Sequence, residues 1–225
     1  MNLLRGKTIL LTGGSRGIGA ETAYKLAGEG AILLVTYQRN RKMAQDLCKK
    51  CHDLGAERAE EIELNLGNNK SIEMCAEFIK SNYGHLNVLI NNAGVIVWKR
   101  LRDQTFDEIE YQIRTNLEGT LKLTKLLLPY IRETIISIGS GAGYMGDPEL
   151  APYCATKWGI RGFTKALALD EKSLRIVSVH PGMTKTDMTG YRGVPPQDVA
   201  DIILRTAKGE FGKSSGDDVN IFEML

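Results

Sequence analysis

The 225-residue sequence contains few cysteines and lacks a long apolar run. Its four cysteines give no framework for disulfides, and the Cys48-x-x-Cys51 pair lacks the second ligand pair that a structural zinc site needs. We therefore expect no metal, and we expect both cysteines simply to occupy a helix. The apolar run at residues 8–11 is too short for a signal peptide or a membrane span. We accordingly expect no membrane partner and a cytoplasmic location.

The sequence also lacks a large excess of either charge, since 29 basic and 27 acidic residues are interspersed and leave a formal net charge of +2. The sequence has no basic stripe of the kind that nucleic-acid binding requires, so we expect no nucleic-acid partner. It also shows no internal repeat, linker or low-complexity tract. A hydrophobic content of 43% is ample for one core, and we expect a single domain over residues 1–225.

Short runs rich in Ile, Leu and Val alternate with longer segments of helical character. This rhythm predicts an α/β fold in which a parallel sheet carries helices on both faces. The predicted strands are residues 8–11, 31–36, 59–64, 88–91, 134–138, 175–179 and 219–222. The predicted helices are residues 17–29, 41–54, 69–82, 103–131, 152–171 and 196–207.

A glycine-rich turn separates the first predicted strand from the first predicted helix. It reads Thr12-Gly13-Gly14-Ser15-Arg16-Gly17-Ile18-Gly19. Glycines at such a turn permit positive φ angles and let backbone N–H groups approach a pyrophosphate, whose charge the helix N-terminus favours. The placement of the turn therefore predicts a dinucleotide site.

A second set of residues has the pattern of an acid–base centre. Tyr153 and Lys157 are four residues apart, which places them on one face of a helix. Pro152 suits the first helical position, so the helix dipole and the Lys157 ammonium are both expected to lower the pKa of Tyr153 from its ordinary ~10. Ser140 ends the fifth predicted strand at the carboxyl edge of the sheet, where its hydroxyl is placed to bind a carbonyl oxygen.

These motifs, together with Asn91-Asn92-Ala93-Gly94 at the end of the fourth predicted strand, resemble the short-chain dehydrogenase/reductase family over residues 7–222. The resemblance is to the single-domain type that includes 3-oxoacyl-thioester and carbonyl reductases. It implies a Rossmann-type, doubly wound parallel sheet of about seven strands in the order 3-2-1-4-5-6-7. It further implies hydride transfer between nicotinamide C4 and a carbonyl carbon. Tyr153 would exchange the proton, Ser140 and Lys157 would assist, and Asn116 would hold a water that links Lys157 to solvent.

The segment after the second predicted strand bears on the choice of coenzyme. Tyr37-Gln38-Arg39 offers no carboxylate for the ribose hydroxyls of NAD, and Arg16 and Arg39 are candidates for the 2′-phosphate of NADP. We therefore expect NADP(H) to be favoured over NAD(H), although Arg39 could instead belong to a solvated charge run. Residues expected at the coenzyme are Gly13, Ser15, Arg16, Gly17, Ile18, Gly19, Tyr37, Gln38, Arg39, Asn65, Leu66, Asn92, Ala93, Gly94, Tyr153, Lys157, Pro181, Gly182, Thr184 and Thr186.

The substrate side is less specified. The loop at residues 183–195 is short, which predicts an open cleft for a moderately hydrophobic ketone or aldehyde. Its candidate lining residues are Trp98, Tyr144, Met145, Leu150, Met183, Met188 and Tyr191. The alternatives to an NADPH-dependent carbonyl reductase are an NAD-linked alcohol dehydrogenase acting oxidatively and a catalytically silent NADP(H)-binding sensor or scaffold. A sugar-nucleotide epimerase is a third alternative, but such enzymes normally have a longer C-terminal substrate domain than this sequence contains.

The resemblance also implies a homodimer or homotetramer that associates through helices 103–131 and 152–171. The sequence lacks the double-glycine ending that many family members show, and the last strand often contributes to the tetramer. This departure puts the tetramer in more doubt than the dimer.

Overall fold

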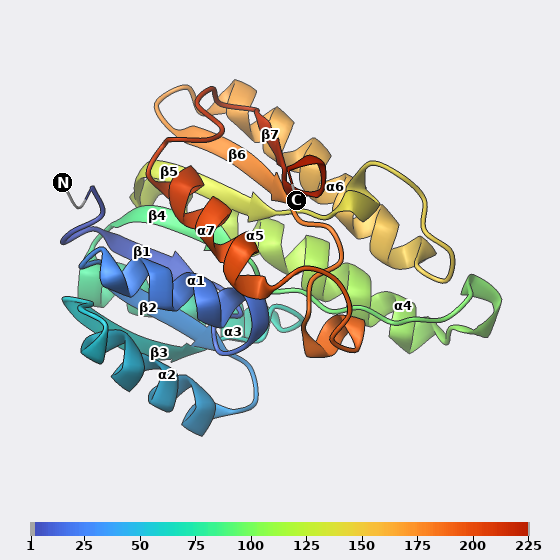
Figure 1. Cartoon of the computed structure of the whole chain (residues 1–225), viewed down its shortest axis with the longest axis horizontal. Helices are drawn as coiled ribbons and strands as arrows, with labels where there is room; N and C mark the ends of the chain where they lie inside the picture. Colours follow the sequence, from blue (N-terminus) through green and yellow to red (C-terminus); the bar gives the residue numbers. More distant parts are fainter. Residues whose placement is uncertain (1–2, 225) are drawn as a thin grey trace.

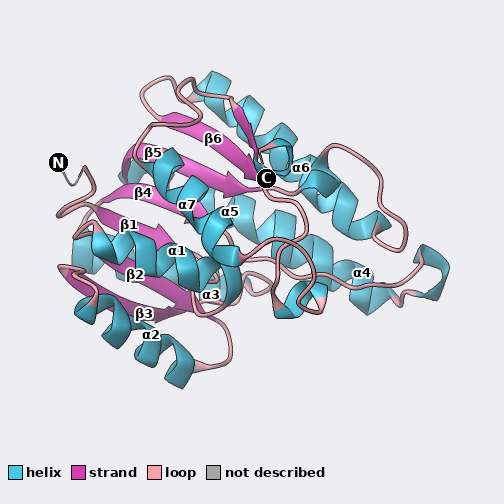
Figure 2. Ribbon diagram, in the orientation of Figure 1, coloured by secondary structure: helices cyan, strands magenta, loops and turns pink. Residues whose placement is uncertain are grey.

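Seven parallel strands form one sheet in the order β3-β2-β1-β4-β5-β6-β7 (Figures 1 and 2), which confirms the predicted order. The computed structural model describes residues 3–224. The strands are β1 (Thr8–Leu11), β2 (Ile32–Tyr37), β3 (Arg58–Glu63), β4 (Leu86–Asn91), β5 (Ile131–Ile138), β6 (Arg175–His180) and β7 (Asp218–Asn220). After β3 the chain crosses back to the other side of β1 and adds β4 there, so the strand order reverses between β1 and β4.

Helices cover both faces of this sheet (Figure 2). The helices are α1 (Gly17–Gly28), α2 (Arg41–Asp53), α3 (Asn69–Tyr83), α4 (Phe106–Ile113), α5 (Gly119–Leu127), α6 (Ala151–Asp170) and α7 (Pro196–Ala207). One face is packed by α1, α2 and α7, and the opposite face by α3, α5 and α6.

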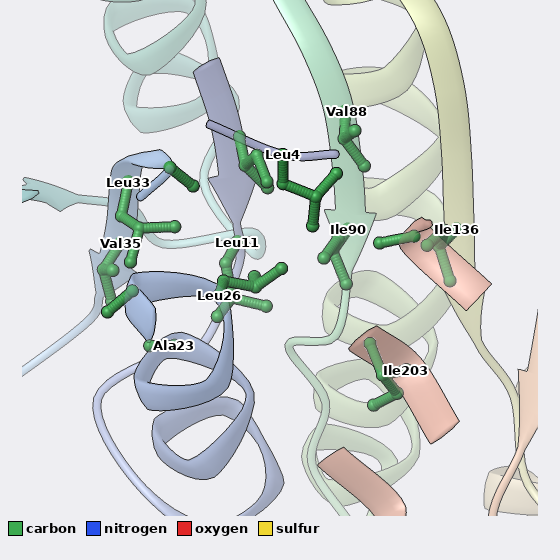
Figure 3. Packing of buried hydrophobic residues seen from close by; sticks show 14 of the residues in the cluster. Leu4, Leu11, Ala23, Leu26, Leu33, Val35, Val88, Ile90, Ile136 and Ile203 are labelled. Atoms are coloured by element: carbon green, nitrogen blue, oxygen red, sulfur yellow. The ribbon is translucent and has the colours of Figure 1, made fainter. Parts of the chain in front are cut away.

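Alternation along the strands explains why the central strands have apolar residues on both sides. Ile9 and Leu11 of β1 join the core beneath α1 and α7, whereas Leu10 between them joins the core beneath α3 and α5. Figure 3 shows the first of these cores, in which Leu11 and the neighbouring strands meet Leu26 of α1 and Ile203 of α7. Because both of their faces are buried, β1 and β2 contain continuous Ile, Leu and Val runs, whereas the edge strands β3 and β7 are largely polar.

The predicted helix at residues 103–131 is confirmed as one helical run over residues 106–130, although residues 104–105 before it are not helical and Ile131 already belongs to β5. The chain forms a 3-10 turn at Leu101–Asp103, then α4, a π-helical turn at Arg114–Glu118, α5, and a second 3-10 turn at Leu128–Tyr130. Thr105 caps α4 through a capping box with Glu108, so the helix begins at Phe106. The apolar periodicity continues through the π-helical turn, which is why the sequence pattern did not reveal it.

One smaller difference concerns the end of a predicted element. The last predicted strand, residues 219–222, is shorter than expected, because Ile221–Glu223 form a 3-10 turn after β7. Cys48 and Cys51 lie on the buried side of α2, as expected for an ordinary helix. Among residues 3–224, no helix is both long and apolar enough to span a membrane.

Candidate active site

A cavity of about 940 Å³ lies at the carboxyl ends of the central strands. Its wall includes the glycine turn after β1, the ends of β2, β4, β5 and β6, and the first turns of α6. This is the edge of an open α/β sheet at which ligands bind, next to the point where the strand order reverses. Ser140, Tyr153 and Lys157 all line the cavity.

Close backbone packing shapes the glycine turn. Gly13 has a φ angle of +63°, and a Cβ atom added to it would lie 2.8 Å from the Cα atom of Ala93. A Cβ atom on Gly19 would lie 2.4 Å from the carbonyl oxygen of Gly13. Side chains at these positions would therefore displace backbone, and the turn remains open for a ligand to approach its N–H groups.

Two threonines fix the turn to its neighbours, and neither was predicted from the sequence as part of the site. The Thr12 hydroxyl accepts hydrogen bonds from the backbone N–H groups of Asn92 at 2.9 Å and Ala93 at 3.0 Å. The Asn92 side chain donates in return to the carbonyl oxygens of Thr12 and Gly13, at 2.9 and 3.1 Å. Thr36, at the end of β2, accepts from the Gly13 N–H at 3.0 Å. The ends of β1, β2 and β4 are thus joined around the cavity.

The basic residues after β2 differ in their surroundings. Arg41 pairs with Glu61 at 3.3 Å and Lys42 pairs with Asp46 at 2.8 Å, so both have acidic partners. Arg39 lines the cavity and makes no ion pair with any residue between 3 and 224. The guanidinium of Arg39 is therefore available to an anionic ligand, unlike its two basic neighbours.

Helix α6 brings Tyr153 and Lys157 together, as their spacing predicted. Both side chains are buried, and the Lys157 Nζ atom lies 5.6 Å from the centre of the Tyr153 ring. The Nζ atom also donates to the Ile138 carbonyl oxygen at 2.9 Å, which ties the ammonium to the end of β5. The helix begins at Ala151, one residue earlier than Pro152 suggested.

The predicted lowering of the Tyr153 pKa is wrong in this structure. Burial raises the pKa of Tyr153 to about 12, and a hydrogen bond with Ser140 offsets that effect only in part. Burial also lowers the pKa of Lys157 to about 8. The sequence argument counted favourable neighbours and left out the cost of removing both groups from water, which is the larger effect here.

Two predicted site residues do not line the cavity. Asn116 lies in the π-helical turn, where its carboxamide accepts from the Val95 N–H at 2.7 Å and donates to the Val95 carbonyl at 2.7 Å. Asn65 turns its side-chain oxygen to the Gly67 N–H at 3.0 Å. Both side chains hold backbone segments in place. The other predicted residues all line the cavity: Gly13, Ser15, Arg16, Gly17, Ile18, Gly19, Tyr37, Gln38, Arg39, Leu66, Asn92, Ala93, Gly94, Ser140, Tyr153, Lys157, Pro181, Gly182, Thr184 and Thr186.

The expected substrate side contains all but one of its predicted apolar residues. Trp98, Met145, Leu150, Met183, Met188 and Tyr191 line the cavity. Tyr144 does not, because its ring packs edge-on against His180 and Phe222, with ring centres 4.8 and 5.4 Å apart. Position in the loop after Ser140 suggested a lining role for Tyr144, but the sequence carries no signal for the direction of its ring.

The loop at residues 183–195 contacts both sides of the cavity. The Trp98 indole N–H donates to the Met188 carbonyl at 2.9 Å, which links the loop to the segment after β4. On the other side, Asp187 pairs with Arg16 of the glycine turn at 3.0 Å. Tyr111 of α4 also lines the cavity. It was missed because it belongs to no motif, although it lies only five residues before Asn116.

Comparisons with known proteins agree with this architecture. The family model for short chain dehydrogenases matches residues 7–194. The 3-oxoacyl-acyl-carrier-protein reductase FabG of Haemophilus influenzae is 32% identical over 94% of this chain and 87% of its own length. The trans-4-hydroxycyclohexanecarboxylate dehydrogenase of Sinomonas cyclohexanicum is 31% identical over 93% of this chain and 89% of its own length.

A solved structure extends the likeness to the fold in three dimensions. The short chain dehydrogenase from Burkholderia cenocepacia, crystallised in complex with NADP, superposes with a TM-score of 0.89 at 28% identity, covering 96% of each chain. The chain belongs to the short-chain dehydrogenase/reductase family. It is accordingly a nicotinamide-dependent oxidoreductase that acts on CH–OH or C=O groups of a small molecule.

Proposed function

We propose that this protein is an NADPH-dependent carbonyl reductase in which Tyr153 is the general acid. The observation that carries the proposal is the convergence of Ser140, Tyr153 and Lys157 on the cavity that also contains the glycine turn. Residues 1–225 would form a single NAD(P)-binding domain, with residues 183–195 as its substrate loop.

The residues present fit a nicotinamide dinucleotide. The glycine turn leaves no room for side chains at Gly13 and Gly19 and is open toward the cavity, as binding a pyrophosphate by backbone N–H groups requires. Asn92, Ala93 and Gly94 would lie against the coenzyme, while Thr184 and Thr186 line the end of the cavity near Pro181. When bound, the nicotinamide supplies or accepts a hydride at C4.

The acid–base chemistry belongs to the residues of this chain. Tyr153 holds its proton firmly, since burial raises its pKa to about 12, and it would give that proton to the carbonyl oxygen as hydride adds to the carbon. Ser140, hydrogen-bonded with Tyr153, would donate to the same oxygen. Lys157 would hold the nicotinamide ribose while its Nζ atom stays near the Tyr153 ring. Asn116 would support this centre by fixing Val95.

The preference for NADP(H) over NAD(H) is supported by Arg39. A 2′-phosphate carries a charge that an unpaired guanidinium attracts. Position 37 is a tyrosine and therefore offers no carboxylate that would repel the phosphate. We expect NADPH to exceed NADH by at least about tenfold in kcat/KM, which corresponds to about 1.4 kcal/mol. Gln38 would contact the same end of the coenzyme.

The substrate would be a moderately hydrophobic ketone or aldehyde, with 3-oxoacyl thioesters as one form of it. Trp98, Met145, Met183 and Tyr191 line the cavity and keep substantial exposed apolar surface, which an apolar substrate would cover. The FabG relative supports reduction. The cyclohexanecarboxylate dehydrogenase relative supports the alternative, oxidation of a secondary alcohol.

We further propose a cytoplasmic homodimer or homotetramer. Phe106 on α4 is 91% exposed, and Trp158 and Leu169 on α6 are 48% and 70% exposed. Large exposed apolar side chains on these helices are costly in a monomer and would be covered by a second copy. Size measurement by light scattering in solution tests the association.

A substrate panel tests the function. Purified protein is mixed with NADPH or NADH and with ketones, aldehydes and 3-oxoacyl thioesters, and loss of the reduced-nicotinamide absorbance is followed. We expect turnover with NADPH that falls at least about 10²-fold in the Tyr153→Phe variant, while coenzyme still binds. Equal efficiency with NADH would refute the coenzyme preference. Coenzyme binding without turnover of any compound would instead support a sensor.

A further inference from the structure

A fully buried histidine faces the backbone of Ser140. His180 ends β6, and its side chain is 0% exposed. Its ring nitrogen Nδ1 lies 3.4 Å from the Ser140 N–H nitrogen and 3.3 Å from the Ser140 carbonyl oxygen. Because β5 and β6 are paired neighbours, this imidazole lies directly beside the end of the strand that presents Ser140.

The ring is held tightly in this place. A Cβ atom added to Gly139 would lie 2.3 Å from Nδ1 of His180, so only glycine lets the imidazole lie against the strand at the residue before Ser140. The Tyr144 ring packs edge-on against the other side of the imidazole, with ring centres 4.8 Å apart. His180 therefore has little freedom to turn away from Ser140.

The second ring nitrogen faces a carboxylate. Nε2 of His180 lies 3.3 Å from Oδ1 of Asp218 in β7, a charge contact, and makes no hydrogen bond with any residue between 3 and 224. Three donors fix the Asp218 carboxylate: Arg161 Nε at 3.0 Å, Lys165 Nζ at 2.8 Å and Ser178 Oγ at 2.7 Å. Although burial acts in the opposite direction, these hydrogen bonds hold the pKa of Asp218 well below its usual range, so the group is charged.

These surroundings select one form of the imidazole. Burial lowers the pKa of His180 and outweighs the Asp218 carboxylate and the Ser140 backbone, which act in the opposite direction, so the ring is neutral near neutral pH. The carboxylate opposite Nε2 favours the tautomer with its proton on Nε2, since a neutral ring carries only one N–H. Nδ1 is then a lone-pair acceptor and takes the hydrogen bond from the Ser140 N–H.

We propose that His180, oriented by Asp218, is a positioning residue that fixes the backbone of Ser140 and thereby aims its hydroxyl at the substrate oxygen. The inference rests on the proposed catalytic role of Ser140. It gives the C-terminal strand a part in the reaction centre, because β7 supplies the carboxylate that orders the imidazole. Neither His180 nor Asp218 touches the substrate.

A matched pair of amides tests this proposal. In His180→Asn the side-chain oxygen takes the place of Nδ1 and can still accept from Ser140, whereas His180→Gln places its amide near Nε2 and leaves Ser140 without an acceptor. We expect the Asn variant to keep kcat within about threefold of the wild type. We expect the Gln variant to lose about 10- to 100-fold in kcat, with KM for NADPH and its Kd changed less than about twofold.

Equal kcat values for the two amide variants, or a lower value for His180→Asn, would overturn the proposal. Thermal unfolding monitors whether each variant is folded. If one is not, Asp218→Asn takes its place: a loss of kcat with unchanged coenzyme Kd supports the proposal, and a wild-type kcat overturns it. Tyr153→Phe separates the two levels of inference. Full activity of that variant would refute the proposed function itself, whereas an inactive Tyr153→Phe beside an active His180→Gln would refute only the positioning role.

Discussion

The guanidinium of Arg16 lies 3.0 Å from the carboxylate of Asp187, and this pair joins the glycine turn to the loop after β6. The Tyr191 hydroxyl donates to the same carboxylate. Both members of the ion pair are more than half exposed, so the attraction between them is weak. Arg16 is nevertheless one of the two cations proposed for the coenzyme phosphate, and Asp187 competes with that phosphate for it.

Replacing Asp187 by Asn removes the competing charge. We expect the Kd for NADPH to fall by up to about fivefold, the range that an exposed ion pair of about 1 kcal/mol allows, while the Kd for NADH stays unchanged. Fluorescence titration of both coenzymes measures the change. The same substitution in an Arg16→Ala background is the control and should have no effect. A comparable gain for NADH and NADPH would contradict the competition.

The raised pKa of Tyr153 gives the two directions of the reaction different pH profiles. With a pKa of about 12, the phenol that protonates a carbonyl oxygen is fully present across the neutral range, so kcat for reduction should be flat up to the pKa of Lys157, about 8. Oxidation needs the phenolate, whose population grows about tenfold per pH unit below the pKa. Initial rates with a ketone and NADPH, and with the matching alcohol and NADP⁺, measure the contrast between pH 6 and 10. A reductive kcat that already falls between pH 6 and 7, below the pKa of Lys157, would disprove it.

Burial of Lys157 should cost stability at neutral pH. Its folded pKa of about 8 lies below its ordinary 10.5, so the unfolded chain binds more protons between these values and the free energy of unfolding rises with pH there. Below pH 8 the cost is complete, on the order of 3 kcal/mol before the hydrogen bond to Ile138 is counted. Lys157→Met should therefore raise the free energy of unfolding by about 1–3 kcal/mol at pH 7.

This stabilisation should disappear as the pH approaches 10.5, where Lys157 loses its proton in both the folded and the unfolded wild-type chain. Urea titrations at pH 7 and pH 10 measure it. Lys125→Met, which changes an exposed lysine on α5, serves as the control and should have almost no effect at either pH. A destabilised Lys157→Met at pH 7 would show that the contacts of the ammonium outweigh its desolvation.

Two helical glycines should respond oppositely to alanine. A Cβ atom on Gly119, where α5 begins, would lie 2.1 Å from the Leu66 carbonyl oxygen, so Gly119→Ala should cost about 1–3 kcal/mol of unfolding free energy. Gly162, inside α6, has nothing within 4 Å of the same position. Gly162→Ala should stabilise by about 0.5–1 kcal/mol, because alanine favours the helix. Chemical denaturation of both variants provides the comparison, and a stabilised Gly119→Ala would rule out the close approach.

The parts of the fold that the sequence predicted are those governed by local pattern. Continuous apolar runs marked the strands, and the glycine turn and the Tyr153–Lys157 spacing placed the site at the sheet edge. The π-helical turn within helix 103–131 left no signal in the sequence, although it carries Asn116, which reaches Val95, and precedes Gly119, which packs against Leu66. These contacts join segments far apart in the chain and leave no periodic trace.

The same limit applied to the electrostatics of the site. The residues near Tyr153 were identified correctly, but the sign of its pKa shift depends on how completely the ring is removed from water. Likewise, the sequence could not show that Tyr144 turns toward His180 and away from the cavity. Depth of burial and ring direction are set by the assembled core, which no short segment encodes.

Helix α6 has one further property, since Tyr153, Lys157, Arg161 and Lys165 follow one another at intervals of four residues. The first pair lines the cavity, and the second pair holds Asp218 of the last strand. One stripe of a single rigid helix thus runs from the proton donor to the carboxyl-terminal segment. The carboxyl-terminal segment therefore supplies the carboxylate that anchors the helix carrying the proton donor.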